Sequence, residues 1–377
     1  MIESPFQYGS LATKDNFVDR IAERASLKQM LYSGINVSLI SPRRWGKSSV
    51  VKMAMDELAE EKKEVRVCYL DAFSIDSIDD FYSAFASSVI SGTSTKVEKA
   101  ISDVKKYLGG IIPGLTISDG LNDIISINFK HNPLETNCLE ILDLPEKIAK
   151  DKGLKVIVCI DEFQQLAKLD GYSELEGKMR SVWQKQGCVS YCFYGSKKHM
   201  MLDIFNDSQK PFYRFTNIEF LPKIAKTDWV PFIVGGFAKT GKSISESFAG
   251  KICDFVDCHS WYVQQLSYFV WADTESVVSE EILENACTRI VDTNAPMFTS
   301  DLEKLTSSQK AMLKAIARGE TQLSSEAVRG KYALGNLTTI TRNKKVLQTK
   351  SFVDINDNLL TISDPVFFKW FTKKYDI

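Results

Sequence analysis

The fold is decided by residues 36–48, which read Asn36-Val-Ser-Leu-Ile-Ser-Pro-Arg-Arg-Trp-Gly-Lys-Ser48. The apolar run 36–40 predicts a buried strand, and apolar residues that recur at helical intervals after Lys47 predict a helix. A strand, a tight loop and a helix in this order bring backbone NH groups and a helix N-terminus to one point. The loop is therefore a candidate binding site for phosphate.

The loop matches the Walker A pattern except at its first position, where the pattern has glycine and this chain has Ser41. In such a loop Lys47 reaches the β and γ oxygens of a nucleotide, and the Ser48 hydroxyl binds magnesium. Gly46 is needed because a side chain there would collide with phosphate. The candidate nucleotide-binding residues of the loop are Pro42, Arg43, Arg44, Trp45, Gly46, Lys47, Ser48 and Ser49.

Arginines in and beyond the loop each have two interpretations. Arg43 and Arg44 lie inside the loop, where they contact phosphate or pair with acidic neighbours. Arg180 and Arg214 are candidates for an arginine finger on the same or a neighbouring subunit, and a surface salt bridge is the alternative for each. The sequence leaves these choices open.

Polar residues at the ends of two later strands complete the candidate site. The apolar run 155–160 predicts a strand that ends in Asp161 and Glu162. In P-loop enzymes such an Asp holds magnesium through its water shell, and an adjoining Glu polarises the attacking water. Seen alone, the pair would be a solvated strand end or a helix N-cap, but the upstream loop favours a nucleotide site. Ser196, after the predicted strand 189–194, is a candidate γ-phosphate sensor or a turn residue.

The catalytic set is thus Glu162, Lys47 and Ser196, and the metal ligands are Ser48 and Asp161. Cys253, Cys258 and His259 lie close in the sequence, but no fourth ligand with a recognisable zinc spacing accompanies them. We therefore expect no zinc site.

The composition indicates a soluble globular protein of two or three domains. The chain has 377 residues, 44% hydrophobic and 25% charged. Its net charge of -1 provides no overall attraction to nucleic acid or to an anionic membrane. The eight cysteines include no CxxC pair, as expected of free thiols in a reducing compartment. With no signal-like start and no run long enough to span a membrane, a cytoplasmic location is expected.

The order of elements predicts three domains. Strands alternate with helices over residues 1–222, which predicts a parallel α/β sheet with helices on both faces. Helical periodicity dominates residues 223–296, which predicts a small helical lid. Residues 297–377 read as short helices followed by a hairpin around Asn356, Asp357 and Asn358, the order found in a winged helix.

With these motifs in place, the chain resembles the archaeal-type ATPases of the AAA+/STAND group of P-loop NTPases. The resemblance implies an AAA+-like core, a helical lid, a winged-helix domain, and ATP with Mg²⁺ as ligand. It places Asp19 and Arg20 near the adenine and ribose. The chain departs from the family at Ser41 and at Ser260, where family lids often have proline. The matching stretches are 17–23, 42–48, 161–164, 193–196, 199–201, 211–215, 259–264 and 364–367.

Two functions remain open. The first is an ATPase, with ADP and phosphate as products, that couples its nucleotide state to a conformational change. The second is a slow or non-hydrolysing switch that binds a partner protein or DNA through its winged helix, or associates with itself. Residues 301–377 hold 13 Lys and Arg against 8 Asp and Glu, and residues 337–350 have the character of a DNA recognition helix. The alternative is that the winged helix packs on the ATPase core or binds a protein, and that these charges form an ordinary solvated face. A small-molecule kinase is disfavoured because a lid and a winged helix have no place in it.

Overall fold

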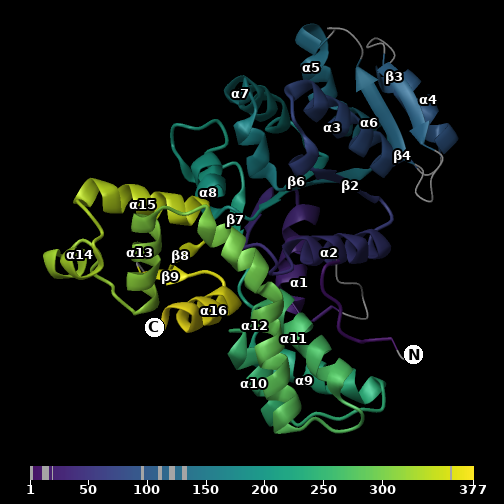
Figure 1. The fold of residues 1–377 in the computed structure, drawn as a ribbon. Helices are drawn as coiled ribbons and strands as arrows, with labels where there is room; N and C mark the ends of the chain where they lie inside the picture. Colours follow the sequence, from purple (N-terminus) through teal and green to yellow (C-terminus); the bar gives the residue numbers. More distant parts are fainter. Residues whose placement is uncertain are drawn as a thin grey trace. The chain divides into compact units, whose positions relative to one another are not determined.

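The computed structural model describes residues 3–10, 17–18, 20–94, 97–108, 113–118, 124–129, 134–356 and 359–377. The chain divides into two compact units, which we call the sheet unit and the helical unit (Figure 1). The sheet unit is Arg20–Pro222, and the helical unit combines Met1–Asp19 with Lys223–Ile377. The predicted limit between residues 296 and 297 falls inside one continuous helix, α12 (Glu280–Glu303). The three domains therefore remain a proposal.

Five parallel strands form the central sheet of the sheet unit, in the order β2-β5-β6-β1-β7. This arrangement confirms the predicted fold class. β1 and β6 are buried along their whole length, because a parallel sheet is covered on both faces. The strands are β1 (Val37–Ile40), β2 (Val65–Asp71), β5 (Lys155–Asp161), β6 (Val189–Gly195) and β7 (Asn217–Phe220).

Strand register brings three strand ends together. Asp161 at the end of β5 pairs with Tyr194 of β6, and Gly195 pairs with Ile40 at the end of β1. The phosphate loop that follows β1 therefore lies on the same sheet edge as the residues that follow β5 and β6. A parallel sheet places all its carboxyl ends at that edge, which is where such folds bind ligands.

Helices cover both faces of this sheet, with α1 and α2 on one side and α3 and α6 on the other (Figure 1). The apolar spacing over 141–152 predicts a single helix, but the structure has two helices, α5 and α6, that break at Asp143. Pro145 stands in the first turn of α6, where its missing NH is not needed. The helices are α1 (Ile21–Tyr32), α2 (Lys47–Glu61), α3 (Ile78–Thr93), α4 (Val97–Leu108), α5 (Leu134–Leu142), α6 (Leu144–Lys152), α7 (Tyr172–Trp183) and α8 (Lys198–Asn206).

A hairpin of β3 (Pro113–Ser118) and β4 (Ile124–Phe129) forms a second, two-stranded sheet. Alternating apolar residues over 124–129 predict a hairpin or an edge strand, and the structure has the hairpin. The sequence pattern over 91–133 is otherwise less regular, but this stretch contains the helix α4. The hairpin and α4 interrupt the alternation of sheet strands and helices between α3 and α5.

Aromatic rings form the centre of the sheet-unit core. Phe163, which directly follows Glu162, lies with its ring centroid 4.5 Å from that of Phe193 on β6. Phe205 and Phe212 also contact both rings. All four side chains are buried, so the short turn after β5 is anchored to β6 by packing.

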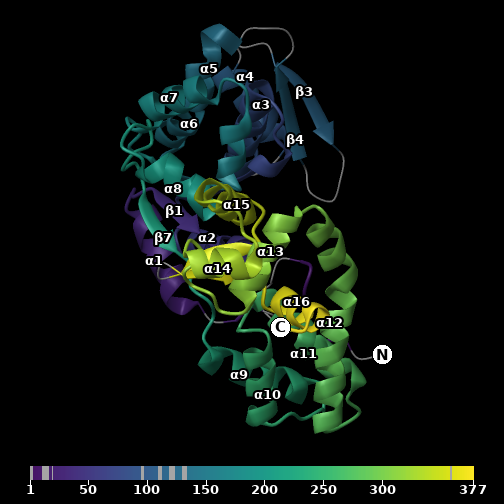
Figure 2. The ribbon, with the colours of Figure 1, turned by 60° about the vertical axis from the view of Figure 1, so that its left-hand side comes forward.

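The helical unit contains a four-helix region and a winged helix, as the sequence predicts. α12 packs on α11 and on α16, the last helix of the chain (Figure 2). Near the chain start, Phe6 is buried against Phe232 and Phe237 of α9. The elements are α9 (Lys226–Lys239), α10 (Glu246–Phe255), α11 (Ser260–Asp273), α12, α13 (Ser307–Ala317), α14 (Glu326–Tyr332), α15 (Leu337–Thr349), β8 (Val353–Asn356), β9 (Leu359–Ile362) and α16 (Pro365–Tyr375). Within the described part of the chain, every helix is too short or too polar to cross a membrane.

Candidate functional site

The phosphate loop runs from the end of β1 to the first turn of α2. Gly46 is the N-cap of α2 and has a φ of 88°, a conformation that a side chain would strain. Arg44 also has a positive φ, 67°. Left-handed residues at these two positions turn the chain sharply into the helix. The backbone conformation therefore favours glycine at position 46, in addition to the predicted close approach of phosphate.

Ser41, which replaces the first glycine of the motif, is accommodated without strain. It is not among the described residues with a positive φ, so its backbone conformation is open to any residue. The side chain is buried, and its hydroxyl donates to the carbonyl of Pro42 at 3.1 Å. The backbone NH of Ser41 donates to the carbonyl of Gly195. The conformational freedom of glycine is not used at this position.

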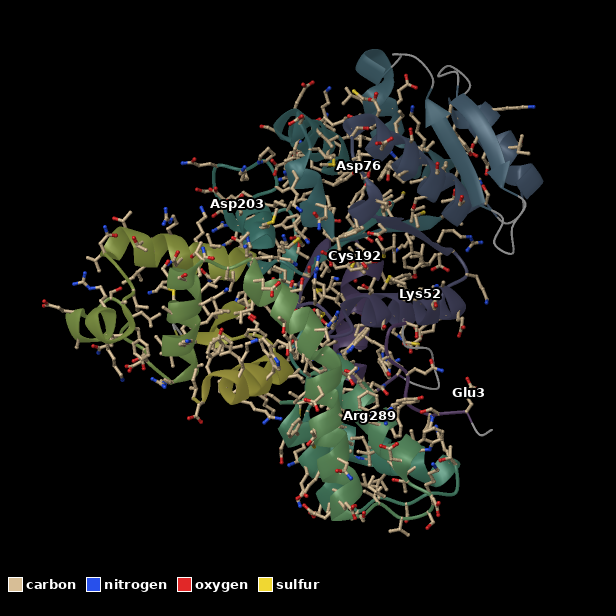
Figure 3. The ribbon with its side chains drawn as sticks, in the orientation of Figure 1. Glu3, Lys52, Asp76, Cys192, Asp203 and Arg289 are labelled. Carbon is tan, nitrogen blue, oxygen red and sulfur yellow. The ribbon has the colours of Figure 1, made fainter. Side chains whose placement is uncertain are left out.

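Five predicted residues form one hydrogen-bonded network, which we call the carboxylate network. Lys47 Nζ lies 2.6 Å from Glu162 Oε1 and 3.3 Å from Asp161 Oδ1. The Ser48 hydroxyl donates to Asp161 Oδ2 at 2.6 Å, and the Ser196 hydroxyl donates to Glu162 Oε2 at 2.8 Å. In Figure 3, Lys52 marks α2, which begins with Lys47 and Ser48, and Cys192 marks β6, which Ser196 directly follows.

The pKa values of the two carboxylates, Asp161 and Glu162, are shifted in opposite directions. Burial raises the pKa of Asp161 above its ordinary value, and Lys47 and Ser48 offset only part of that effect. Burial also acts to raise the pKa of Glu162. The charge of Lys47 and hydrogen bonds from Lys47, Ser196 and Gln164 outweigh it, so the Glu162 pKa is lowered. Glu162 is therefore ionised at neutral pH and available as a base.

The donor set of this network suits magnesium. Ser48 and Asp161 present a hydroxyl and a carboxylate oxygen 2.6 Å apart, and Mg²⁺ prefers such hard oxygen ligands. The described residues include no cluster of three or more His, Cys, Asp or Glu side chains that could hold a metal. A magnesium ion here would take its remaining ligands from water and phosphate, which is its usual behaviour at nucleotide sites.

Arg20 contacts the loop from the start of α1. It is buried, has a φ of 61°, and is the N-cap of the helix. Its guanidinium donates to the carbonyl of Trp45 at 3.2 Å and to Glu23 at 3.1 Å. The expected contacts of Arg20 with adenine and ribose remain a prediction, and Asp19 lies outside the described residues.

Sequence reasoning assigned no role to two further residues near the network. Gln164 donates to Glu162 Oε2 at 2.6 Å, and its only signal was its place in the stretch 161–164. Burial and the nearby cations Lys168 and Arg43 lower the pKa of Lys197, the residue after Ser196. This positive charge beside the network would favour an anionic ligand.

The remaining predicted residues are placed as follows. Pro42, Trp45 and Ser48 are half-buried, Arg43 and Arg44 are exposed, and Ser49 is buried. Arg180 lies over the ring of Phe215, and Arg214 lies over the ring of Tyr213, with distances to the ring centroids of 4.7 and 5.2 Å. Each of the two arginines therefore has an aromatic partner in the described part of the chain, and the choice between an arginine finger and a salt bridge stays open.

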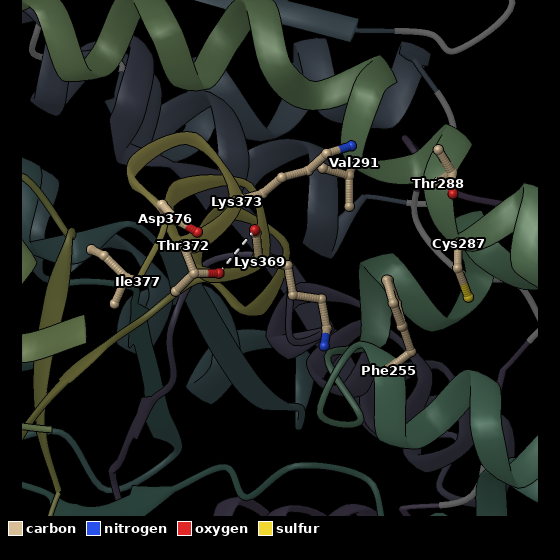
Figure 4. Close-up of a pocket in the computed structure, with 9 residues that line it drawn as sticks. All are labelled: Phe255, Cys287, Thr288, Val291, Lys369, Thr372, Lys373, Asp376 and Ile377. Carbon is tan, nitrogen blue, oxygen red and sulfur yellow. Dashed lines mark hydrogen bonds between the residues drawn. The ribbon is translucent and has the colours of Figure 1, made fainter. Parts of the chain in front are cut away.

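A separate hollow of about 560 Å³ lies in the helical unit between α10, α12 and α16 (Figure 4). Lys369 rests over the ring of Phe255, and burial raises the pKa of Cys287 to about 11, so this thiol stays protonated. The hollow therefore offers no activated nucleophile, and the carboxylate network is the better candidate site. Its lining residues are Phe255, Cys287, Thr288, Val291, Lys369, Thr372, Lys373, Asp376 and Ile377.

Two family models match the chain, one over its larger N-terminal part and one near its C-terminus. A family model described as an ATPase domain predominantly from Archaea matches residues 17–266. A second model, described as a probable winged helix domain, matches residues 296–373. No curated protein sequence matches the chain.

Solved structures share the fold over nearly the whole chain. The Walker-type ATPase of Pyrococcus abyssi is similar with a TM-score of 0.70 and 17% identity, covering 95% of this chain and 97% of that one. The ORC2 protein of Aeropyrum pernix, solved as ADPNP-ADP complexes, gives 0.58 and 15%, covering 99% and 100%. The ORC1 protein of the same organism, solved in complex with DNA, gives 0.51 and 14%, covering 99% and 98%. At these identities the similarity shows the fold.

Proposed function

This chain belongs to the family of ATPase domains found predominantly in Archaea, and on that premise we propose that it hydrolyses ATP with Mg²⁺ at the carboxylate network. The observation that carries the proposal is the contact of Lys47 with Glu162 and Asp161 at the sheet edge. A phosphate-binding cation, a candidate metal ligand and a candidate base are within one hydrogen-bonded cluster. A purely structural ion pair would not require the adjoining loop and helix N-terminus.

Binding would use the loop and the first turn of α2. The backbone NH groups of residues 43–48 and the positive end of the α2 dipole attract the phosphates, and Lys47 contacts the β and γ oxygens. Ser48 and Asp161 would hold Mg²⁺, directly and through water. The ion, when bound, neutralises negative charge on the phosphate oxygens.

Hydrolysis would use Glu162 as the base and Ser196 as the polar group beside it. A water oxygen attacks the γ-phosphorus while Glu162 takes up its proton. The bond from the γ-phosphorus to the β–γ bridging oxygen breaks, and ADP leaves with the electron pair. The products are ADP and inorganic phosphate, and the proton returns to solvent from Glu162.

The chain's path supports coupling of the nucleotide state to a conformational change. The chain passes between the units at residues 19–20 and 222–223. Arg20 stands at the first of these points and hydrogen-bonds the Trp45 carbonyl in the phosphate loop. A change in the loop on nucleotide binding would therefore act directly on a residue at the junction of the units.

A slow switch that binds DNA or a protein is the second candidate, and the surface of α15 favours it. Thr338, Thr341, Arg342 and Lys345 are exposed on this helix, and polar and basic groups of this kind suit a DNA groove. The structurally similar ORC1 protein was solved with DNA. Exposed apolar side chains at Leu337, Ile355 and Leu359 instead favour a protein partner or self-association.

The state of the cysteines fits the cytoplasmic location that we propose. All eight are free thiols in the structure. Thiols are kept reduced in the cytosol, whereas disulfides form and persist in oxidising compartments.

The deciding experiment compares ATP binding and hydrolysis by wild type, Lys47→Ala and Glu162→Gln, with Mg²⁺ or EDTA and with or without duplex DNA. We expect Lys47→Ala to lose binding, Glu162→Gln to bind with only a small residual rate of turnover, and EDTA to abolish hydrolysis. Turnover stimulated by DNA would support a role of the winged helix in DNA binding. Tight ADP retention with negligible turnover would support the switch, and absence of nucleotide binding by wild type would disprove both.

A further inference from the structure

The Gln164 amide is buried against the candidate base. Its side chain has 0% exposure, and its Nε2 donates to Glu162 Oε2 at 2.6 Å. Ser196 donates to the same oxygen, whereas Glu162 Oε1 faces Lys47. The two carboxylate oxygens therefore have separate partners: neutral donors fix Oε2, and a cation contacts Oε1.

The backbone conformation explains how the side chains of Glu162 and Gln164, two residues apart, form a hydrogen bond. Glu162 has a left-handed conformation with a φ of 48°, and the short 3-10 helix Phe163–Lys168 begins directly after it. A reversal of this kind turns the side chains of Glu162 and Gln164 toward each other, whereas residues two apart on a regular helix do not face each other. The buried ring of Phe163 fixes the turn against β6.

The other end of the amide occupies a space that exists because residue 195 is glycine. A Cβ on Gly195 would lie 1.9 Å from Gln164 Oε1 and 2.9 Å from Met201 Sδ. Any other residue there would displace the amide. The last residue of β6 therefore leaves room for Gln164 next to the sensor residue Ser196.

The amide is retained at an energetic cost. Gln164 Oε1 is buried and has no hydrogen-bond partner among the described residues. A buried, unsatisfied carbonyl is unfavourable, and an apolar side chain of equal size would avoid that cost. Turning the amide over would not help, because its oxygen would then face the oxygen of Glu162. A group kept in place despite such a cost calls for a functional reason.

We infer that Gln164 is a positioning residue for ATP hydrolysis, holding Glu162 by Oε2 so that Oε1 faces the attacking water. Lys47 contacts Oε1, and that oxygen is released when the ammonium turns to phosphate. The bonds from Gln164 and Ser196 to Oε2 keep the carboxylate from following Lys47. This inference rests on the proposed ATPase function.

The test uses Gln164→Met, a change that keeps the length of the side chain and removes its donor. Gln165→Met is the matched control, since Gln165 is the next residue, is partly exposed and bonds Lys168. We expect Gln164→Met to lower kcat about tenfold or more, while KM, ADP affinity and the melting temperature stay near wild type. The control should match wild type in all four. Gln164→Leu provides the same test should the methionine variant fail to fold.

Two further readouts separate positioning from a general effect. In the Glu162→Gln background, Gln164→Met should lower the residual rate no further, because the group through which it acts is gone. A crystal structure of Gln164→Met should show the residue 162 carboxylate rotated away from its position beside Ser196. An unchanged kcat with the carboxylate in place, or an equal loss in both backgrounds, would overturn the inference.

Failure of the proposed function gives a different result. If wild type binds ATP but never hydrolyses it, the ATPase proposal fails. The crystal structures would still show whether Gln164 holds the Glu162 carboxylate in place. A displaced Glu162 in Gln164→Met would then support the positioning role without catalysis. An undisturbed Glu162 would refute it.

Discussion

Lys47 Nζ lies 2.6 Å from Glu162 Oε1, so the proposed phosphate ligand and the proposed base contact each other directly. Phosphate and carboxylate therefore compete for the same ammonium group. A side chain of similar shape without charge at position 162 should compete less and should also repel the phosphates less.

Glu162→Gln should accordingly bind ADP several-fold more tightly than wild type, because Lys47 is released and one negative charge is removed. Calorimetric titration with Mg-ADP measures this without interference from hydrolysis. Glu61→Gln is the control, since Glu61 lies at the other end of α2 and pairs with Lys28. An affinity for ADP equal to or weaker than that of wild type would show that the contact does not oppose binding.

Arg20 should matter for the shape of the phosphate loop. Arg20→Met removes the hydrogen bond to the Trp45 carbonyl, and we expect affinities for ATP and ADP to fall together by about tenfold. Arg24→Met is the control one turn along α1, where the arginine pairs with Glu57. Fluorescent-nucleotide titrations of both variants decide the matter. Equal losses in the two would mean that α1 stability, and not the loop contact, is responsible.

Much of the fold and the geometry of the site followed from the sequence for a physical reason. Short apolar runs at 36–40, 155–160 and 189–194 predict buried strands of a parallel sheet, and such strands end at a common edge. Polar residues directly after those runs had to lie near one another. The contacts of Lys47 with Asp161 and of Ser196 with Glu162 are the result.

Other features depend on contacts that no local pattern reveals. Apolar spacing over 15–32 predicts one helix, but α1 begins at Ile21, after the left-handed Arg20, which bonds the Trp45 carbonyl. Residues 15, 16 and 19 lie outside the described part of the chain. β7 was not predicted, since its four residues are only partly buried. The role of Gln164 depends on the reversal at Glu162 and on the space at Gly195, which are known only once β6 is placed beside β5.

The surface of α15 allows a direct test for DNA. If this helix enters a DNA groove, Arg342→Glu with Lys345→Glu should abolish binding to duplex DNA, and wild-type binding should weaken steeply with salt. Lys304→Glu with Lys373→Glu changes the charge equally on exposed residues outside α15 and is the control. Gel-shift titrations at two salt concentrations measure both. Equal loss in the two double variants would indicate attraction by net charge alone.

Glu176 on α7 should make the stability of the protein depend on pH. Its side chain is 1% exposed, and its Oε1 has no hydrogen-bond partner in the described part of the chain. Burial raises the pKa of Glu176 to about 7; Asp203 adds to the increase, and Lys210 opposes it. Between the ordinary carboxyl pKa of 4.5 and about 7, the folded protein holds a proton that the unfolded chain has lost. The free energy of unfolding therefore falls as pH rises through that window and stays lower above it.

Glu176→Gln lacks this titration, so we expect it to be more stable than wild type at pH 8 by about 1–3 kcal/mol. The difference should shrink toward zero at about pH 5, where the wild-type carboxyl is protonated in the folded state. Urea unfolding at the two pH values measures it. Glu174→Gln is the control on the same helix, because that exposed carboxylate pairs with Lys178 and its pKa is lowered. Glu174→Gln should be no more stable than wild type at pH 8. If Glu176→Gln is more stable than wild type by the same amount at both pH values, packing and not charge is responsible for the difference.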